Sequence, residues 1–303
     1  MQVHSRREKT MKRSVISLLL VLVLVPAIAG AELSAWFVDV GQGDCTVIVC
    51  DGEAMIIDGG HGEMSRKVYS FVRETLGLKH VDYMISTHPH EDHLGGLAAV
   101  LNAVPVDLLL TPVTAWPTGR FAQVMRYAAR GGTPVDVPQA GDRLALGGAV
   151  VTVLHCWPEA PEVCENDVND MSIVVRIDYG STSFLIAGDA EETAEYMMLD
   201  TGLPLRADVL RVAHHGSTHS TSPAFLRAVS PAYAVISCGA GNDHGHPHRR
   251  VLNALKCQGT VLFRTDLQGT IRCVSDGENV MFSTEREVAD EALFSTLRWT
   301  AEK

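Results

Sequence analysis

The sequence predicts an α/β (α+β) protein in which two β-sheets are packed between outer layers of helices, a four-layer αββα sandwich. Short apolar runs of strand length alternate with helical patterns from Leu33 onward. The strands fall into two strand-rich halves interleaved with helices, which favours two sheets over one doubly wound parallel sheet. No linker rich in Pro, Gly or Ser divides residues 32–303, so we expect them to form a single domain.

The elements follow from local composition. Strands are predicted where β-branched and apolar residues lie between Gly- and Asp-containing turns, and helices where apolar residues recur with helical spacing. The predicted strands are 33–40, 46–50, 55–58, 83–87, 107–111, 150–154, 172–177, 183–187, 209–213, 232–237 and 261–263. The predicted helices are 64–76, 95–103, 121–130, 191–199, 248–257 and a terminal helix from Val280 onward.

The N-terminus has the pattern of a targeting segment. Lys12-Arg13 precedes an apolar run over 15–25, and Ala29-Gly30-Ala31 forms an A-x-A cleavage site before Glu32. The run is shorter than the about 20 apolar residues of a spanning helix. We therefore expect residues 1–31 to be a cleaved signal peptide, with export to the periplasm or the extracellular space. An uncleaved membrane anchor is the alternative. No later stretch is long enough to span a membrane.

The charge limits the partners. The formal net charge is -11, and the first 31 residues carry five basic side chains against one acidic one, so the remainder is more acidic still. Such a body does not attract polyanions over its whole surface, and we expect no extensive basic surface for nucleic acid. One modest basic cluster, Arg249, Arg250 and Lys256, follows His246, and a solvated helix face explains it equally well.

The cysteines indicate no zinc finger. There are seven, an odd number, and none has zinc-finger spacing. Cys156 and Cys164 flank a Pro-containing loop that a disulfide could close, while several others are expected to be small buried hydrophobes.

The strongest chemical signal is the stretch Thr87-His88-Pro89-His90-Glu91-Asp92-His93, which directly follows a predicted strand. In an extended turn His88 and His90 can point the same way and grip one cation, while Asp92 and His93 turn toward a second site. Imidazole and carboxylate ligands suit zinc, and manganese where oxygen donors dominate. A chance cluster of His in a polar loop is the alternative, which the H-x-H-x-D-H spacing disfavours.

Further motifs accompany this stretch in a fixed order between about residues 33 and 274. They are Phe37-Val38-Asp39-Val40-Gly41-Gln42-Gly43-Asp44, Ile56-Ile57-Asp58-Gly59-Gly60, Asn169-Asp170-Met171-Ser172, Ala187-Gly188-Asp189, Ala213-His214-His215-Gly216-Ser217 and His246-Pro247. The set resembles the metallo-β-lactamase superfamily, and within it the nuclease-like domain of the ComEC/Rec2 competence proteins. The choline-phosphate esterase of pneumococcal cell walls carries a similar set, so the resemblance does not fix the substrate.

The resemblance implies roles for individual residues. Asp189 would bridge two metal ions, and one member of the pair His214/His215 would complete the second site. We expect His214 to be that ligand, because it directly follows the strand 209–213, and His215 to face the substrate. The expected metal ligands are therefore His88, His90, Asp92, His93, Asp189 and His214, and the expected catalytic residues are Asp92, His215 and His246.

Other residues are expected to support this set. Asp58 would orient a ligand His from behind, and Asn169 would support the ligands in the same way. Asp39 and Asp44 lie in a Gly-containing turn, where a structural role is at least as plausible. His244 and His248 are expected to be solvated neighbours of His246. Structural explanations also stay open for Asp189, as a strand-end turn, and for the His pair.

The chain departs from the superfamily pattern at one position. Many superfamily hydrolases supply a third His between the helix after His93 and Asp189, and the only candidate here is His155. The ComEC-like group does not clearly use the comparable His as a ligand. The first site would then hold only His88, His90 and Asp189 with water, which leaves the open position that a catalytic site needs.

These residues predict an exported binuclear hydrolase that uses a metal-bound hydroxide. Two divalent ions about 3.5–4 Å apart activate water and stabilise both the attacking and the leaving oxygen of a displacement. Zn²⁺ is the expected metal, and Mn²⁺ is the second choice. The expected substrate is a phosphoester, including nucleic acid, which makes the protein a phosphodiesterase or nuclease-type enzyme. The alternatives are an envelope hydrolase of small phosphoesters, of the choline-phosphate esterase kind, and a non-catalytic metal-binding protein on the same fold. No motif indicates a binding site for the carboxylate of a β-lactam, so we do not expect a true β-lactamase.

Overall fold

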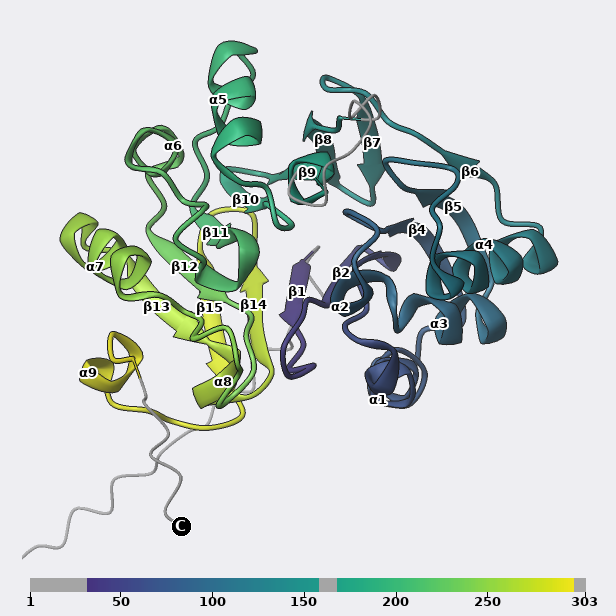
Figure 1. Cartoon of the computed structure of the whole chain (residues 1–303), viewed down its shortest axis with the longest axis horizontal. Helices are drawn as coiled ribbons and strands as arrows, with labels where there is room; N and C mark the ends of the chain where they lie inside the picture. Colours follow the sequence, from purple (N-terminus) through teal and green to yellow (C-terminus); the bar gives the residue numbers. More distant parts are fainter. Residues whose placement is uncertain (1–31, 158–167, 297–303) are drawn as a thin grey trace, which may run out of the picture. The chain divides into compact units, whose positions relative to one another are not determined.

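The architecture rests on two β-sheets, which the computed structural model describes over residues 32–157 and 168–296 (Figure 1). The first sheet has the strand order β15-β14-β1-β2-β3-β4-β5-β6. Its strands are β1 (Leu33–Phe37), β2 (Thr46–Cys50), β3 (Glu53–Ile57), β4 (Val81–Ile85), β5 (Val106–Leu110), β6 (Val135–Asp136), β14 (Ile271–Ser275) and β15 (Val280–Thr284). Neighbours from β15 to β3 are antiparallel, and those from β3 to β6 are parallel.

The second sheet has the order β13-β12-β11-β10-β9-β8-β7. Its strands are β7 (Arg143–Leu146), β8 (Ala149–His155), β9 (Val174–Tyr179), β10 (Thr182–Ile186), β11 (Val209–Arg211), β12 (Tyr233–Ile236) and β13 (Val261–Arg264). The four strands from β10 to β13 are parallel. Because β3 and β4 are parallel in one sheet and β10 and β11 in the other, each sheet collects the polar residues that follow these strands at one end.

A hydrophobic core fills the space between the two sheets. Phe37 and Ile48 from the first sheet belong to the same buried cluster as Val151, Val175 and Phe184 from the second. All five are fully buried, and burying side chains of this size stabilises the fold by about 1.5–3 kcal/mol each. Since these residues alternate along their strands with residues of the outer faces, the two-residue period of the strands sets which face is inner.

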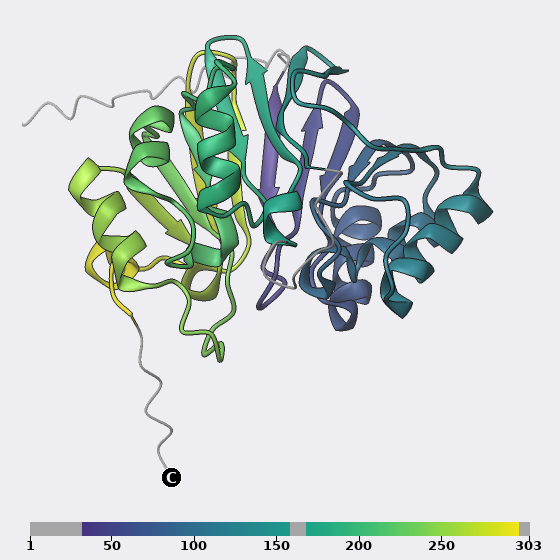
Figure 2. The ribbon, with the colours of Figure 1, turned by 45° about the horizontal axis from the view of Figure 1, so that its top comes forward.

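Helices cover the outer face of each sheet (Figure 2). Those on the first sheet are α1 (Ser65–Ser70), α3 (Leu97–Ala103) and α4 (Gly119–Gly131), and those on the second are α5 (Glu192–Asp200), α6 (Pro223–Val229) and α7 (Arg249–Gln258). A buried cluster joins each group to its sheet, through Val68 and Leu97 on one side and Phe225 and Leu255 on the other. The layers are therefore helix, sheet, sheet and helix, and the αββα prediction is confirmed.

Short helical turns complete the fold. They are η1 (Gly62–Met64), η2 (Phe71–Thr75), η4 (Asn169–Met171), η5 (Ala213–Gly216), α2 (Glu91–Leu94), α8 (Thr265–Gln268) and α9 (Asp290–Leu293). The segment predicted as a helix over 64–76 consists of η1, α1 and η2 in succession. The helix predicted over 95–103 is α3, which begins at Leu97, and the short α2 precedes Gly95-Gly96.

The prediction of a terminal helix from Val280 onward is wrong. Residues Val280–Thr284 form β15, an edge strand paired with β14, and up to residue 296, where the described part of the chain ends, only the short α9 follows. Side chains alternate along β15: Met281 is 65% exposed, whereas the Phe282 ring stacks on Phe263 with 4.2 Å between centroids. This alternation is the strand period. The sequence reasoning also missed β6, β7, β14 and α6.

Two expectations cannot be compared with this structure. The predicted signal peptide and the loop that carries Cys164 lie outside the described residues, so both stay predictions. Cys45, Cys50, Cys238 and Cys273 are buried, which confirms that several thiols are part of the core. Within residues 32–157 and 168–296, no helix has the length and apolar character needed to cross a bilayer.

Candidate metal centre

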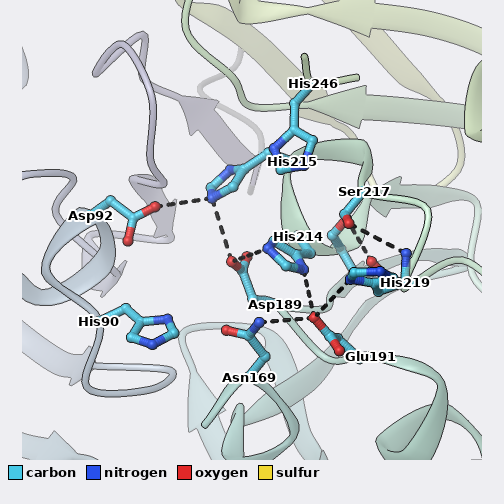
Figure 3. A network of polar contacts seen from close by, with 12 residues as sticks. His90, Asp92, Asn169, Asp189, Glu191, His214, His215, Ser217, His219 and His246 are labelled. Atoms are coloured by element: carbon cyan, nitrogen blue, oxygen red, sulfur yellow. Dashed lines mark hydrogen bonds and ion pairs between the residues drawn. The ribbon is translucent and has the colours of Figure 1, made fainter. Parts of the chain in front are cut away.

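The predicted ligands converge because they follow strands that end on the same side of their sheets. Asp58 follows β3, and the stretch from His88 to His93 follows β4. In the second sheet Asp189 follows β10, and His214-His215 follows β11. Figure 3 shows the side chains of Asp92, Asp189 and His215 turned toward one another across the gap between the sheets. The centre is therefore made by both sheets, at the ends of their central strands.

Asp58 fixes the first ligand segment. Its two carboxylate oxygens accept hydrogen bonds from the backbone N–H and the hydroxyl of Thr87, at 2.8 and 2.7 Å. The Nδ1 of His93 lies 2.8 Å from Asp58 Oδ2. When Nδ1 of His93 carries the proton and donates a hydrogen bond to Asp58, Nε2 keeps its lone pair for a metal. Asp58 thus lies where the sequence analysis placed it, behind a ligand His.

The side chains of His88 and His93 are buried, and the ring of His90 lies beside that of His88. The Nε2 atom of His88 is 3.0 Å from Nδ1 of His90, which brings two ring nitrogens to one point. Burial lowers the pKa of His88 well below its ordinary value, so this ring is neutral and available as a ligand. The structure therefore places His88 and His90 where they can share one cation.

Asp189 occupies the middle of the centre. Its Oδ2 lies 3.2 Å from His93 Nε2 and 3.4 Å from His215 Nε2. Among the described residues, four sets of donor atoms from this centre lie close enough to hold an ion, namely His88–His93–Asp189, Asp92–His93–His215, Asp44–Asp189–His215 and Asp44–Asp58–His93. A fifth set, His80–Asp82–Asp107, contains none of these residues. Asp189 belongs to two of these sets, as a bridging carboxylate would.

The donor chemistry fits divalent cations. Within the described residues, Nε2 of His93, Oδ1 of Asp189 and Oδ1 of Asp44 are buried without a hydrogen-bond partner, which is costly unless another group satisfies them. Burial alone would lower the pKa of His93, but the carboxylates of Asp189, Asp58 and Asp92 raise it well above its ordinary value. The carboxylates therefore favour a cation in this place, and the imidazole and carboxylate donors suit zinc or a similar ion.

The His pair is oriented in the reverse of the expected order. His215 is 1% exposed, and its Nδ1 lies 2.9 Å from the carbonyl oxygen of Ser237. Its Nε2 faces Asp92 at 3.2 Å. His214 instead turns Nδ1 toward Glu191 at 2.9 Å, and its Nε2 is 3.8 Å from Asp189 (Figure 3). Thus His215, and not His214, lies within the candidate ligand sets.

The backbone explains this reversal. His214 and His215 both have left-handed backbone angles, with φ of 48° and 53°. Few residues other than Gly adopt this conformation, and here it turns the chain sharply after β11. His215, the second residue of the pair, consequently faces back toward the sheet edge. The position of His214 directly after a strand therefore did not predict which of the two rings faces the centre.

Glu191 is a site residue that the sequence reasoning missed. Its Oε1 accepts a hydrogen bond from Nδ2 of Asn169 at 2.9 Å and pairs with His214. Asn169 thus supports Glu191 rather than a candidate ligand. Burial alone would lower the pKa of His214, but Asp189 and Glu191 raise it above its ordinary value. The only sequence signal was the position of Glu191, two residues after Asp189.

Arg211 is the second residue that was missed. It is fully buried, forms an ion pair with Asp44, donates to the carbonyl oxygen of Gly188, and lies 3.8 Å from Asp189 Oδ1. Burial lowers its pKa to about 9, so it keeps its charge at neutral pH. Asp44 therefore lies close enough to the other donor atoms to bind a metal, and it is also paired with a guanidinium. An arginine within a strand gave no sequence signal of this role.

His246 stands at the mouth of the centre. It lines a cavity of about 650 Å³ together with His90, Asp92, Asp189, His214 and His215. Burial and the neighbouring His rings lower its pKa to about 3, so this ring is neutral. The expectation of solvated neighbours holds only in part: His244 is exposed but lines the cavity, and Nδ1 of His248 accepts a hydrogen bond from the Thr218 backbone.

Comparison with known proteins decides the family. Residues 38–240 match the family described as the Metallo-beta-lactamase superfamily. The chain belongs to this superfamily. ComE operon protein 3 of Bacillus subtilis is 29% identical over 273 residues, covering 84% of this chain and 34% of that protein. Recombination protein 2 of Haemophilus influenzae is 31% identical over 242 residues, covering 77% and 28%.

These relatives make the chain a ComEC/Rec2-like member of the metallo-β-lactamase superfamily. The chain spans about one third of the length of the curated relatives it matches. Among solved structures, the metallo-beta-lactamase fold protein YhfI from Bacillus subtilis has a TM-score of 0.51 at 12% identity, covering 77% of this chain and 96% of that one. That likeness concerns the fold alone.

The ComEC/Rec2-like chain lacks the third His that many superfamily hydrolases have. His155, the only sequence candidate, is buried at the end of β8, and its Nε2 lies 2.8 Å from the carbonyl oxygen of Asp170. It belongs to none of the candidate ligand sets among the described residues. Of the residues expected at the first position, His88 and Asp189 share a candidate ligand set, which His93 completes, while the ring of His90 lies against that of His88.

The two members of the His pair should differ when each is replaced by Ala. We expect His215→Ala to lower metal content, because it removes a nitrogen at the centre. We expect His214→Ala to keep its metal and lose about 10²–10⁴-fold in turnover, the usual range for a general acid or base. Elemental analysis and phosphodiester turnover measure both effects. Tyr196→Ala, at a position on α5 that is 54% exposed, is the control and should change neither. Metal loss in His214→Ala alone would reverse the assignment.

Proposed function

We propose that this chain is an exported binuclear metal-dependent phosphodiesterase. The observation that carries the proposal is the position of Asp189, whose carboxylate lies within 3.4 Å of both His93 and His215 at the floor of an open cavity. Two ions on either side of a bridging carboxylate match the arrangement of paired-metal hydrolases. Zn²⁺ is our first choice and Mn²⁺ the second, because the donors are mixed imidazole and carboxylate.

The proposed ligand set is His88, His90 and Asp189 for one ion, with Asp92, His93, Asp189 and His215 for the other. When bound, the ions supply activation of water at neutral pH and neutralisation of phosphate charge. We assign to His215, rather than His214, the role of ligand, because its second ring nitrogen faces a backbone carbonyl as in most metal-bound His residues.

The remaining groups have roles that do not involve ligation. His214, held by Glu191, presents Nε2 toward the cavity and can hold the proton that the leaving oxygen needs. Gln42 approaches His246, with 3.5 Å between Nε2 and Nδ1, so the pair can position a phosphoryl oxygen at the mouth. Asp92 is already one of the proposed ligands, and because it lines the cavity beside His215 it can also orient the attacking water.

The expected basic cluster does not favour a long nucleic-acid track. Arg250 donates to the backbone carbonyl of Ser220 at 2.7 Å, so its guanidinium is engaged within the protein. With a net charge of -11, extended polyanions are repelled over most of the surface. These facts favour short or small phosphoesters over long duplexes, and they keep an envelope small-phosphoester hydrolase as the second candidate.

An assay of the full chain with added zinc or manganese tests the proposed activity. We expect hydrolysis of bis-p-nitrophenyl phosphate and of short single-stranded DNA, slower action on duplex DNA, and no hydrolysis of nitrocefin. Asp189→Asn should lower the diesterase rate by at least about 100-fold, because the bridging charge is lost. An unchanged diesterase rate in this variant would contradict the bridging role of Asp189, and nitrocefin turnover without diester turnover would refute the proposal. Preference for p-nitrophenyl phosphocholine would support the second candidate.

Export is a separate proposal that rests on the charged, apolar and A-x-A pattern of residues 1–31. We expect the protein isolated from its native cells to begin at Glu32. N-terminal sequencing measures this directly. Recovery of a chain that keeps residues 14–31 would instead favour a membrane anchor.

A further inference from the structure

A second cavity lies beside the metal centre, on the other side of His90 and Glu91. Its volume is about 530 Å³, and its walls include Trp116, Thr118, Arg120 and Gln123 as well as His90 and Glu91. His90 and Glu91 also line the cavity of the metal centre, so the two spaces share one wall. A group held in the second cavity would therefore lie next to a phosphate held at the metals.

Arg120 forms part of this second cavity. Its Nε and Nη2 donate to Oε1 of Glu91 at 3.2 and 3.0 Å, and its Nη1 donates to Oε1 of Gln123 at 3.1 Å. The guanidinium also packs against the backbone at Gly62, where a Cβ atom would overlap it. These contacts place the guanidinium of Arg120 on the cavity wall, where it remains about one third exposed to solvent.

The charges of the second cavity argue against an ionic occupant. Glu91 offsets the charge of Arg120, so a second phosphate would meet a carboxylate and a cationic group would meet a guanidinium. The walls also include Trp116, whose ring is partly buried against the core. The oxygen of Thr118 accepts from the Phe121 N–H, and Oε1 of Gln123 accepts from Arg120, so these two side chains face a ligand with their hydroxyl and amide hydrogens as donors. An aromatic face surrounded by hydrogen-bonding groups suits a flat, uncharged ring with polar edges.

We infer that the second cavity binds a nucleobase of the substrate. This base belongs to the nucleoside whose esterified phosphate lies at the metal centre. The inference rests on the proposed phosphodiesterase function and adds a substrate class to it. The base stacks on Trp116, and its polar edge meets Thr118 or Gln123. Selectivity for a nucleotide thus comes from a neutral aromatic cavity, which agrees with a surface that carries no extensive positive charge.

The test compares two phosphodiesters that differ only in their bases. One is thymidylyl-3′,5′-thymidine, and the other has abasic tetrahydrofuran residues in place of both nucleosides. In the metal-loaded full chain, we expect Trp116→Ala to raise KM for the thymidine dinucleotide about 10-fold, as expected for the loss of one base–aromatic stack. KM for the abasic diester should stay within about 2-fold, since that substrate has no ring to stack.

Two further variants make the result specific. Trp116→Phe keeps an aromatic face and should restore most of the preference for the thymidine dinucleotide. Trp36→Ala removes a tryptophan that packs on Phe71 and lines neither cavity, so the preference should not change. An equal loss on both diesters in Trp116→Ala, or an unchanged preference, would overturn the inference.

The failure of the inference can be separated from failure of the proposed function. If the wild-type chain cleaves neither diester, the phosphodiesterase proposal fails. Calorimetric binding of thymidine 5′-monophosphate and of 2-deoxyribose 5-phosphate then still tests the cavity. Tighter binding of the nucleotide that Trp116→Ala abolishes would support a base site, and equal binding of both ligands would refute it.

Discussion

A guanidinium buried among carboxylates is the interaction on which the metal centre depends. Arg211 is fully buried between Asp44 and the Gly188-Asp189 turn, and it also approaches Nδ1 of His215 at 3.5 Å. Removing one partner of a buried ion pair costs about 3–5 kcal/mol, because the other charge is left uncompensated. Arg211 therefore allows the carboxylates to gather before any metal binds, and it fixes the turn that carries Asp189.

Much of the fold could be predicted from the sequence, because strand length and turn residues are local signals. The stretch over 46–50 was predicted with the bounds that β2 has, and the strand before His88 was displaced by only two residues. The failures occurred where the partner decides the structure. β15 is a strand because Phe282 packs on Phe263 from β13, a contact that no window around Val280 contains. The helical character expected over 64–76 is confirmed, although the hydrogen-bond pattern changes from α-helical to π-helical at Phe71.

The sequence predicted most of the residues that form the candidate site, but it predicted their orientation less well. The dense spacing from His88 to His93 identified the ligand segment, and the chain order of the other motifs supplied Asp189 and the His pair. Which His faces inward depends on two left-handed residues, and sequence propensity gives little warning of these outside Gly. Arg211 and Glu191 gave no pattern because their partners lie on other elements or across a loop. The sequence likewise gave no signal for Trp116, because its proposed role depends on its place in the wall of the second cavity.

The central claim is that both sheets together hold two metal ions, with Asp189 between them and Arg211 outside the coordination sphere. Anomalous diffraction from crystals of the zinc- or manganese-loaded protein tests this most directly. We expect two peaks about 3.5–4 Å apart, one beside His88 and His90 and one beside Asp92, His93 and His215. A single peak, or an ion that is bound by Asp44 with Arg211 displaced, would contradict it.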